Sequence, residues 1–457
     1  MKSSKSSILC QFRPITSVQF EEQNLTSFAG LTIFHQLFNS LNLKSRLRQC
    51  LQKKSMSTFS PAVIVLLLVV HLLLGYRELR HIRYYHDDPM VRRLLGLKCL
   101  PSVSSISRTL SHMTHQDVDG LQNMITDYVL DRLQKLAVNR VTLDFDGSVI
   151  STGRYAEGTA VGFNKKKKGQ RSYYPLFCTV AQTGQVLNVL HRSGNVHDSN
   201  GAKTFIFDCI HRVKATLPRA LIELRMDSAF FSEEIVSMLD DLDVEYTISV
   251  PFARYAALKY LIEDCADWVR MNKQCDYFET DWKPKKWETL HRFFFIRQQS
   301  KIQNKQPLQL NLFIPYAHEH TFKVIITNKN IRANHIVAFH HGRGSQERLF
   351  AELKSENQMH YVPTNTWHGN QIFLLSAILT HNLTRELQMR SQPPMRNTQP
   401  KRPSLWIFER LDTLRRRFIQ RAGRITRPQD RLTLSMSAND DIEKEMSHYL
   451  EIFKQAA

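Results

Sequence analysis

The stretch VTLDFDGS, residues 141–148, decides how this sequence is expected to fold. Apolar and polar residues alternate through it, which predicts a β-strand with Asp144 and Asp146 on one face. Residues 1–139 carry apolar side chains at three- and four-residue intervals, the spacing of packed helices. After the first strand, the patterns follow the order β-β-α-β-α-β, with strands at 171–183, 185–192, 219–226 and 244–250 and helices at 199–217 and 232–242. This order indicates one mixed sheet covered by helices.

We therefore expect an α/β protein with a mixed-sheet core and a helical N-terminal domain. Strand-like runs at 285–299, 307–315 and 321–328 predict a β-rich insertion in this core, and helical patterns resume at 343–358 and 369–388. Arginine and lysine are concentrated after residue 390. The expected parts are the helical domain at 1–139, the core at 140–266 and 331–390, the insertion at 267–330 and a basic tail at 391–457.

The charge balance points to a polyanionic partner. Lysine and arginine outnumber aspartate and glutamate by 62 to 42, which gives a net charge of +20 and a pI near 9.7. Nucleic acid explains such an excess better than an acidic membrane surface. With 457 residues, 42% hydrophobic and 23% charged, the chain is neither a mini-scaffold nor a disordered or collagen-like protein.

Nothing in the sequence predicts secretion or a membrane partner. The longest apolar run, residues 62–75, is shorter than the roughly 18–20 residues that a spanning helix needs, so it is interpreted as a buried core helix. The N-terminus lacks the apolar segment of a secretory signal. Seven cysteines are scattered without a CxxC pair, which indicates reduced thiols in a reducing compartment, and we expect a cytoplasmic protein.

Three carboxylates occupy positions from which they can act together. Asp146 ends the first predicted strand, Asp227 follows the fourth, and Glu347 lies on a predicted helix. Three carboxylates that meet at one point cannot all stay ionised without a cation. Oxygen ligands that leave room for water and phosphate suit Mg²⁺ or Mn²⁺, and a pair of such ions catalyses phosphodiester displacement. A structural role fits Asp146 alone about equally well, and Asp144 is its rival on the same strand face.

The helix that carries Glu347 shows a second pattern, HxxRxxxExxxxxxK, which runs from His340 to Lys354. Arg343 and Glu347 are four residues apart and Lys354 lies two turns further, so the three share one helix face. An ordinary ladder of salt bridges has the same spacing.

Taken in this order, LDFDGS, LRMDSAFFSEE and HxxRxxxExxxxxxK resemble the Asp-Asp-Glu transposases of bacterial insertion sequences with a Tyr-Arg-Glu-Lys signature. The resemblance covers about residues 140–390 and implies a ribonuclease H-like catalytic core interrupted by the β-rich insertion. It also implies that Mg²⁺ or Mn²⁺ is the cofactor. Gly147 and Ser148 resemble the family's Asp-Gly-Thr and favour Asp146 over Asp144. By the resemblance, the catalytic metal ligands would be Asp146, Asp227 and Glu347. The residues that contact DNA would be Arg343, Lys354 and His340. His340 stands where the family has tyrosine.

For the whole chain, the resemblance implies a transposase that binds terminal inverted repeats, cleaves DNA at the element ends and joins them to target DNA. Its partners would be double-stranded DNA of both kinds and further copies of itself, as a homodimer or a larger assembly. It would act in the bacterial cytoplasm, on the nucleoid. The alternative is a non-catalytic DNA-binding regulator that kept the fold, and the three carboxylates favour the enzyme.

Other basic and aromatic residues have two interpretations each. Lys166, Lys167 and Arg171 lie beside Tyr173 and Tyr174, as in a loop that follows DNA, although a solvated basic turn has the same composition. Trp282 and Trp287 of the insertion suit either an unpaired base or, more simply, core packing. We further expect residues 1–139 to recognise the terminal sequence and the tail to add affinity that is independent of sequence.

Overall fold

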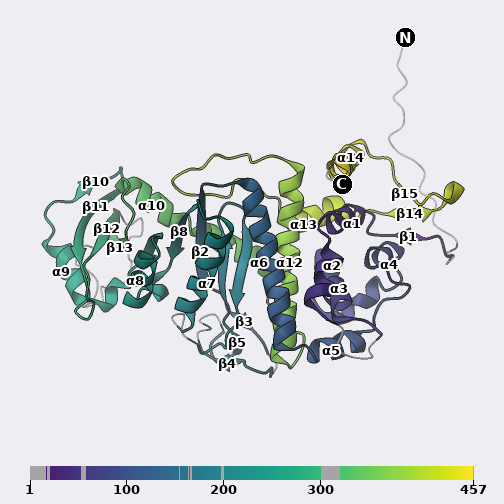
Figure 1. Cartoon of the computed structure of the whole chain (residues 1–457), viewed down its shortest axis with the longest axis horizontal. Coiled ribbons are helices and arrows are strands. Elements are labelled where there is room, and N and C mark those ends of the chain that lie inside the picture. Colours follow the sequence, from purple (N-terminus) through teal and green to yellow (C-terminus); the bar gives the residue numbers. More distant parts are fainter. Residues whose placement is uncertain are drawn as a thin grey trace, which may run out of the picture.

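A computed structural model describes residues 17, 21–52, 58–153, 155–162, 164, 167–196, 200–299 and 320–455. A mixed sheet stands at the centre of the molecule, with the helical N-terminal part on one side and the strands of the insertion on the other (Figure 1). The α/β class, the helical N-terminal region and the β-rich insertion are therefore confirmed. The strand expected at 307–315 lies outside the described residues.

The central sheet contains nine described strands in the order β10-β11-β12-β13-β9-β8-β2-β6-β7. The last five strands in this order have the arrangement and directions expected of a ribonuclease H-like core, because β2 runs parallel to β8, β8 runs parallel to β9, and β6 is antiparallel to both β2 and β7. These five strands are β2 (Arg140–Gly147), β6 (Leu176–Val180), β7 (Gln185–Leu190), β8 (Leu221–Met226) and β9 (Glu245–Ser249).

The segment expected as one strand at 171–183 is divided at Pro175. Proline has no backbone N–H for a ladder hydrogen bond, so the strand ends before it and a new one begins after it. The first part, β5 (Arg171–Tyr173), joins a small separate sheet with β3 (Ile150–Ser151) and β4 (Ala160–Val161). The second part is β6, which forms the expected hairpin with β7.

The two faces of the core sheet differ in polarity. On β2, Val141, Leu143 and Phe145 are fully buried on one face, and Phe145 packs edge-to-face against Phe205 of α7 (Ala202–Thr216). Helix α8 (Glu233–Asp241) contacts α7 and β9 and buries Ile235, Val236, Met238 and Leu239. The opposite face carries Asp144 and Asp146 and is covered by α10 (Ala333–His341) and α11 (Gly344–Ser355). Both candidates for the first catalytic position, Asp144 and Asp146, thus lie on the polar face.

The helical N-terminal part packs against the core through its longest apolar helix. Helix α3 (Pro61–Leu73) begins at the Ser60 cap, and its residues from Ile64 to Leu73 are all buried. It lies against α12 (Trp367–Ser391), which also contacts α6 (His115–Leu136). In the described residues no helix is both long and apolar enough to span a membrane. The remaining elements of this part are β1 (Leu25–Thr26), α1 (Leu31–Ser40), α2 (Leu43–Cys50), η1 (Leu79–Tyr84), α4 (Pro89–Leu95) and α5 (Val103–Ser111).

The insertion extends the central sheet. Strand β13 pairs with β9 through Ile325–Ser249, Ile326–Ile248 and Thr327–Thr247, so the sheet continues without a break into the inserted strands. The short helix η3 (Phe252–Arg254) and helix α9 (Ala256–Asp264) lie between β9 and these strands. The inserted strands are β10 (Val269–Arg270), β11 (Cys275–Trp282), β12 (His291–Gln299) and β13 (His320–Thr327).

The C-terminal segment is packed onto the rest of the chain, whereas the sequence suggested a basic appendage. Arg402 reaches Glu223 of the core at 2.6 Å, and Arg415 donates to the carbonyl oxygens of Leu72 and Leu73 at the end of α3. These arginines hold the tail to both parts of the molecule, so in this structure they are not available to DNA. The elements of the tail are α13 (Leu411–Leu414), β14 (Gly423–Thr426), β15 (Thr433–Met436) and α14 (Asp440–Gln455).

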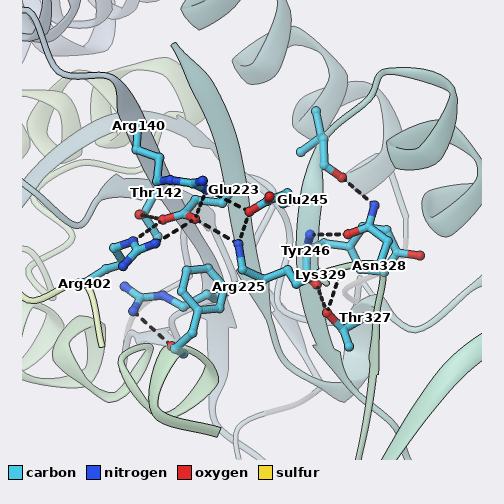
Figure 2. A network of polar contacts seen from close by, with 12 residues as sticks. Arg140, Thr142, Glu223, Arg225, Glu245, Tyr246, Thr327, Asn328, Lys329 and Arg402 are labelled. Atoms are coloured by element: carbon cyan, nitrogen blue, oxygen red, sulfur yellow. Dashed lines mark hydrogen bonds and ion pairs between the residues drawn. The ribbon is translucent and has the colours of Figure 1, made fainter. Parts of the chain in front are cut away.

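A buried polar network ties this tail to the core strands (Figure 2). Glu223 on β8 is fully buried, and its carboxylate is approached by Lys329 at 2.9 Å, Arg140 at 3.0 Å and Arg402 at 2.6 Å. Burial alone would raise the pKa of Glu223, but Lys329, Arg402 and the Thr142 hydroxyl outweigh it and lower the pKa to about 2. Ionised Glu223 therefore stabilises the fold.

The network predicts acid sensitivity. The pKa of Glu223 falls from 4.5 to about 2 on folding, so its contribution, about 3 kcal/mol, is complete above pH ~4.5 and is lost as the pH falls towards 2. Urea unfolding from pH 2 to 6 should show a shallower decline for Glu223→Gln, whose stability at pH 6 is already lower because Arg402 loses its carboxylate partner and Arg140 and Lys329 keep only Glu245. Identical slopes for wild type and variant would contradict this assignment.

Candidate active site

The polar face of the sheet is built by residues that lie opposite one another on three strands. Thr142 and Asp144 on β2 are in register with Glu223 and Arg225 on β8. Glu223 and Arg225 are in turn in register with Glu245 and Thr247 on β9. Because alternate residues of a strand share a face, Asp146 and Asp227 continue this face at the carboxyl ends of their strands.

Asp146 and Asp227 lie at the ends of two adjacent parallel strands. The last registered pair is Phe145 with Met226, and the two aspartates follow it directly. Each carboxylate is also fixed by its own backbone: Asp146 Oδ1 accepts from Gly147 N at 2.8 Å, and Asp227 Oδ1 accepts from Ala229 N at 2.9 Å where η2 (Ser228–Phe230) begins. Both remain partly exposed.

Asp144, the rival for the first catalytic position, has a different role in the structure. Its side chain is 1% exposed and forms a bidentate ion pair with Arg225, with distances of 2.5 Å for Nε–Oδ1 and 2.7 Å for Nη2–Oδ2. A carboxylate whose two oxygens already hold a buried guanidinium is a poor candidate for a metal ligand. The geometry therefore favours Asp146.

Helix α11 is held against the end of β2 by two polar contacts. Gln346 Nε2 donates to the Asp144 carbonyl oxygen at 3.0 Å, and Arg343 Nη1 lies 3.1 Å from Asp146 Oδ2. Glu347, the residue after Gln346, lies on the exposed side of this helix. Among the residues that the structure describes, Arg343 pairs with Asp146 and not with Glu347, so the ladder of salt bridges that the spacing also allowed is not formed here.

Two glycines permit this close arrangement. A Cβ at Gly147 would lie 2.6 Å from the Tyr174 ring, and a Cβ at Gly342 would lie 1.9 Å from Arg225 Nη1 and 2.1 Å from the Lys401 carbonyl oxygen. Gly342 separates α10 from α11, where the sequence suggested helix only from residue 343. Arg225 Nη1 donates to that Lys401 oxygen at 2.8 Å, which places the tail directly behind the site.

The site offers carboxylate oxygens to a metal ion but not a preformed cluster. Within the described part of the chain, no three acidic, histidine or cysteine side chains are grouped closely enough to hold a metal ion. Asp146 and Asp227 nevertheless supply the oxygen donors that Mg²⁺ and Mn²⁺ prefer. The guanidinium of Arg343 beside Asp146 Oδ2 also indicates that this position suits a positive charge. These oxygen donors therefore fit the expected ions. The third expected ligand, Glu347, lies on the neighbouring helix α11.

His340 does not lie where a DNA contact requires it. Its ring is buried on the polar face, with Nδ1 at 3.0 Å from Thr247 Oγ1 and Nε2 at 2.8 Å from Ser249 Oγ. Burial, together with the positive charge of Arg343, lowers the pKa of His340 to about 3, so the ring is neutral. Both ring nitrogens are hydrogen-bonded to β9, so in this structure His340 fixes α10 to β9 and does not make the phosphate contact that was expected.

The other predicted DNA contacts lie around the 160s loop and the end of α11. Lys167 is exposed, Lys354 is partly exposed, and Lys166 lies outside the described residues. Arg171 is held inside the small sheet, because Nε donates to Thr159 Oγ1 at 3.0 Å and its guanidinium lies over the Tyr155 ring at 5.2 Å. Arg171 therefore holds the segment around Tyr155 and Thr159 against β5, in addition to carrying a positive charge.

Comparisons with known proteins settle the family. Residues 10–457 match the family model described as Transposase DDE domain group 1. The chain belongs to this DDE transposase family. No curated protein matches its sequence significantly.

Solved structures of transposases resemble this transposase only distantly. The piggyBac transposase synaptic complex with hairpin DNA matches with 10% identity and a TM-score of 0.39 over 86% of this chain and 80% of that chain. The Mos1 transposase paired-end complex with the left transposon end matches with 10% identity and a TM-score of 0.18 over 37% of this chain and 57% of that chain.

The two tryptophans considered for base stacking, Trp282 and Trp287, pack against other aromatic rings of the transposase, and Trp287 is buried. Trp287 is 8% exposed and stacks on Phe231, with ring centroids 4.9 Å apart, while Trp282 packs edge-on to Phe293 at 5.0 Å. These contacts favour the core-packing interpretation of the sequence over the stacking of an unpaired base.

Sequence reasoning missed two residues that support the candidate site. Arg225 neutralises Asp144, and Gln346 fixes α11 to β2. The signal for Arg225 was present: it precedes Asp227 by two residues, as Asp144 precedes Asp146, so a charged pair on adjacent strands was foreseeable. No sequence signal distinguished Gln346 from an exposed helix residue.

Proposed function

We propose that the chain is the transposase of a bacterial insertion sequence with a Tyr-Arg-Glu-Lys type signature. It would bind the terminal inverted repeats of its element, cleave DNA there in a metal-dependent reaction and join the 3′-hydroxyl to target DNA. The observation that carries the proposal is that Asp146 and Asp227 directly follow the last registered residues of the parallel strands β2 and β8, with α11, which carries Glu347, hydrogen-bonded to β2.

Each residue of the site has a distinct proposed role. Asp146, Asp227 and Glu347 would hold Mg²⁺ or Mn²⁺, which when bound activates the attacking oxygen and stabilises the leaving oxygen. Arg343, at 3.1 Å from Asp146, is positioned to contact a DNA phosphate beside the reacting bond. Lys354, two turns along the same helix, would contact the backbone further from it.

Exposed lysines indicate where the DNA-binding surface would extend beyond the active site. Lys167 is exposed on the loop next to the small sheet, and Lys166 precedes it in the same basic run. We infer that the helical N-terminal domain recognises the terminal sequence and that two or more copies bridge the two ends. Double-stranded DNA of the ends and of the target would be the partners.

Replacing Glu347 with glutamine tests this proposal. Glu347 is exposed and the substitution keeps its volume, so we expect an unchanged melting temperature and unchanged end binding. Cleavage of end-containing DNA should fall on the order of a thousandfold, because one metal-ligating charge is lost. Glu234→Gln, at an exposed position of α8, is the matched control and should cleave normally.

The result also separates the enzyme from the regulator. If wild type and Glu347→Gln bind the ends equally and neither cleaves them, the chain is a DNA-binding regulator. If both cleave at the same rate, Glu347 is not part of the active site.

A further inference from the structure

An exposed group of aromatic and basic side chains lies on residues 76–84 of the helical N-terminal part. Tyr84 is 60% exposed, its ring stacks on His81 with centroids 5.4 Å apart and an interplanar angle of 21°, and Arg83 lies over it at 5.5 Å. Tyr76 lies next to Tyr84 at 5.9 Å. We call these four side chains the Tyr84 platform. What distinguishes Tyr84 from other exposed tyrosines, such as Tyr260 at 63%, is that it lies in a cluster of rings and a guanidinium group.

The platform rests on a rigid base. Tyr76 stacks on Tyr85 at 5.2 Å, and Tyr85 is buried with its hydroxyl 2.7 Å from Nδ1 of the buried His71. His81 is oriented by the Glu78 N–H, which donates to His81 Nδ1 at 3.2 Å. The exposed rings are therefore held in place before any ligand arrives, which lowers the entropic cost of binding.

Positive charge surrounds the platform. Arg77, Arg80 and Arg83 are all exposed, whereas Glu78 is the one acidic residue between positions 76 and 84 and pairs with Arg80 at 2.6 Å. Flat rings next to guanidinium groups match the two features of a nucleic acid strand, its bases and its phosphates.

Arg77, next to Tyr76 in the sequence, is linked by contacts to the end of helix α11 in the proposed active site. The Arg77 guanidinium lies over the ring of Tyr361 at 5.7 Å, and the neighbouring His360 binds the Lys354 carbonyl oxygen through Nδ1 at 2.6 Å. Burial and then the positive charges of Arg77, Lys354 and Lys167 lower the pKa of His360. Cations from three separate segments thus surround one histidine.

We propose that the Tyr84 platform binds an unpaired stretch of DNA by stacking on its bases, while the adjacent arginines hold its phosphates. The bases inside a duplex already stack on one another, so away from the duplex ends only an unpaired base presents a free face to Tyr84. This inference rests on the proposed function, since the strand would be one that is opened near the cleaved end.

The test measures binding of fluorescent probes to the full chain by anisotropy, in EDTA so that no cleavage occurs. The probes are a single strand of thymidines, an abasic strand of equal length and a blunt duplex. For Tyr84→Ala, affinity for the thymidine strand should fall about tenfold, while affinity for the other two probes should change less than about twofold. Tyr84→Trp should retain full affinity, as should Tyr260→Ala, which removes a tyrosine that is 63% exposed on α9.

The abasic strand distinguishes stacking from charge. Equal losses of affinity for the thymidine and abasic strands, or no loss for either, would overturn the proposal. If Tyr84→Ala changes the melting temperature, Tyr84→Leu replaces it, because leucine keeps apolar bulk without a ring face. If the chain fails to cleave DNA in the presence of metal ions but its binding of the thymidine strand still depends on the Tyr84 ring, the proposed function is rejected and the proposed binding by the Tyr84 platform is retained.

Discussion

Replacing Asp227 with asparagine is expected to lower the rate of DNA-end cleavage on the order of a thousandfold or more. Asparagine has nearly the same volume, and its Oδ1 can still accept the Ala229 N–H that holds the aspartate at 2.9 Å. The fold and the affinity for end DNA should therefore be preserved, and only the metal-ligating charge is lost. Gel analysis of cleaved strands, with anisotropy for binding, measures the two quantities separately.

The same reasoning applies to Asp146→Asn, because Asp146 Oδ1 accepts from Gly147 N in the same way. Asp241→Asn is the control, since Asp241 is an exposed residue at the end of α8. Cleavage at the wild-type rate by either active-site variant would remove that residue from the site.

Asp144→Asn is expected to have its largest effect on stability. It breaks the buried bidentate ion pair with Arg225 and leaves the guanidinium without a carboxylate, which typically costs about 3–5 kcal/mol of unfolding free energy. Urea unfolding at neutral pH measures the loss. Pairing Asp144→Leu with Arg225→Met should recover much of it, because no buried charge is then left alone.

Cleavage by the folded fraction of Asp144→Asn, assayed at low temperature, distinguishes the two aspartates of β2. We expect activity per folded molecule to be largely retained, in contrast to Asp146→Asn. A stable but inactive Asp144→Asn would transfer the first catalytic position to Asp144.

Local patterns predicted the core of the fold because its strands are short, alternating and bounded by turn residues. Thr142, Asp144 and Asp146 share one face in the structure, as the alternation requires. Pro175 was visible in the sequence, yet the strand expected at 171–183 ran through it. Its division into β5 and β6 depends on a small sheet with β3 and β4, two strands of two residues each that are too short to give a pattern.

Long-range partners limited the prediction of the site. The sequence places Asp146, Asp227 and Glu347 in order, but it does not show that Arg343 turns to Asp146 or that His340 is enclosed by two hydroxyls from β9. Arg402 and Arg415 likewise have the composition of a DNA-binding tail, and their partners Glu223 and the carbonyl end of α3 lie far away in sequence. Charge alone cannot distinguish an arginine that binds DNA from one that closes a network.

The most direct test of the central claim is to incubate the wild-type chain with duplex DNA that contains an end of its element, in Mg²⁺, Mn²⁺ or EDTA. Mapping the cut strands at nucleotide resolution reports the chemistry without any substitution. We predict cleavage at the element terminus, with a free 3′-hydroxyl, in either metal ion and none in EDTA. Specific binding of the end without cleavage in either ion would contradict the account.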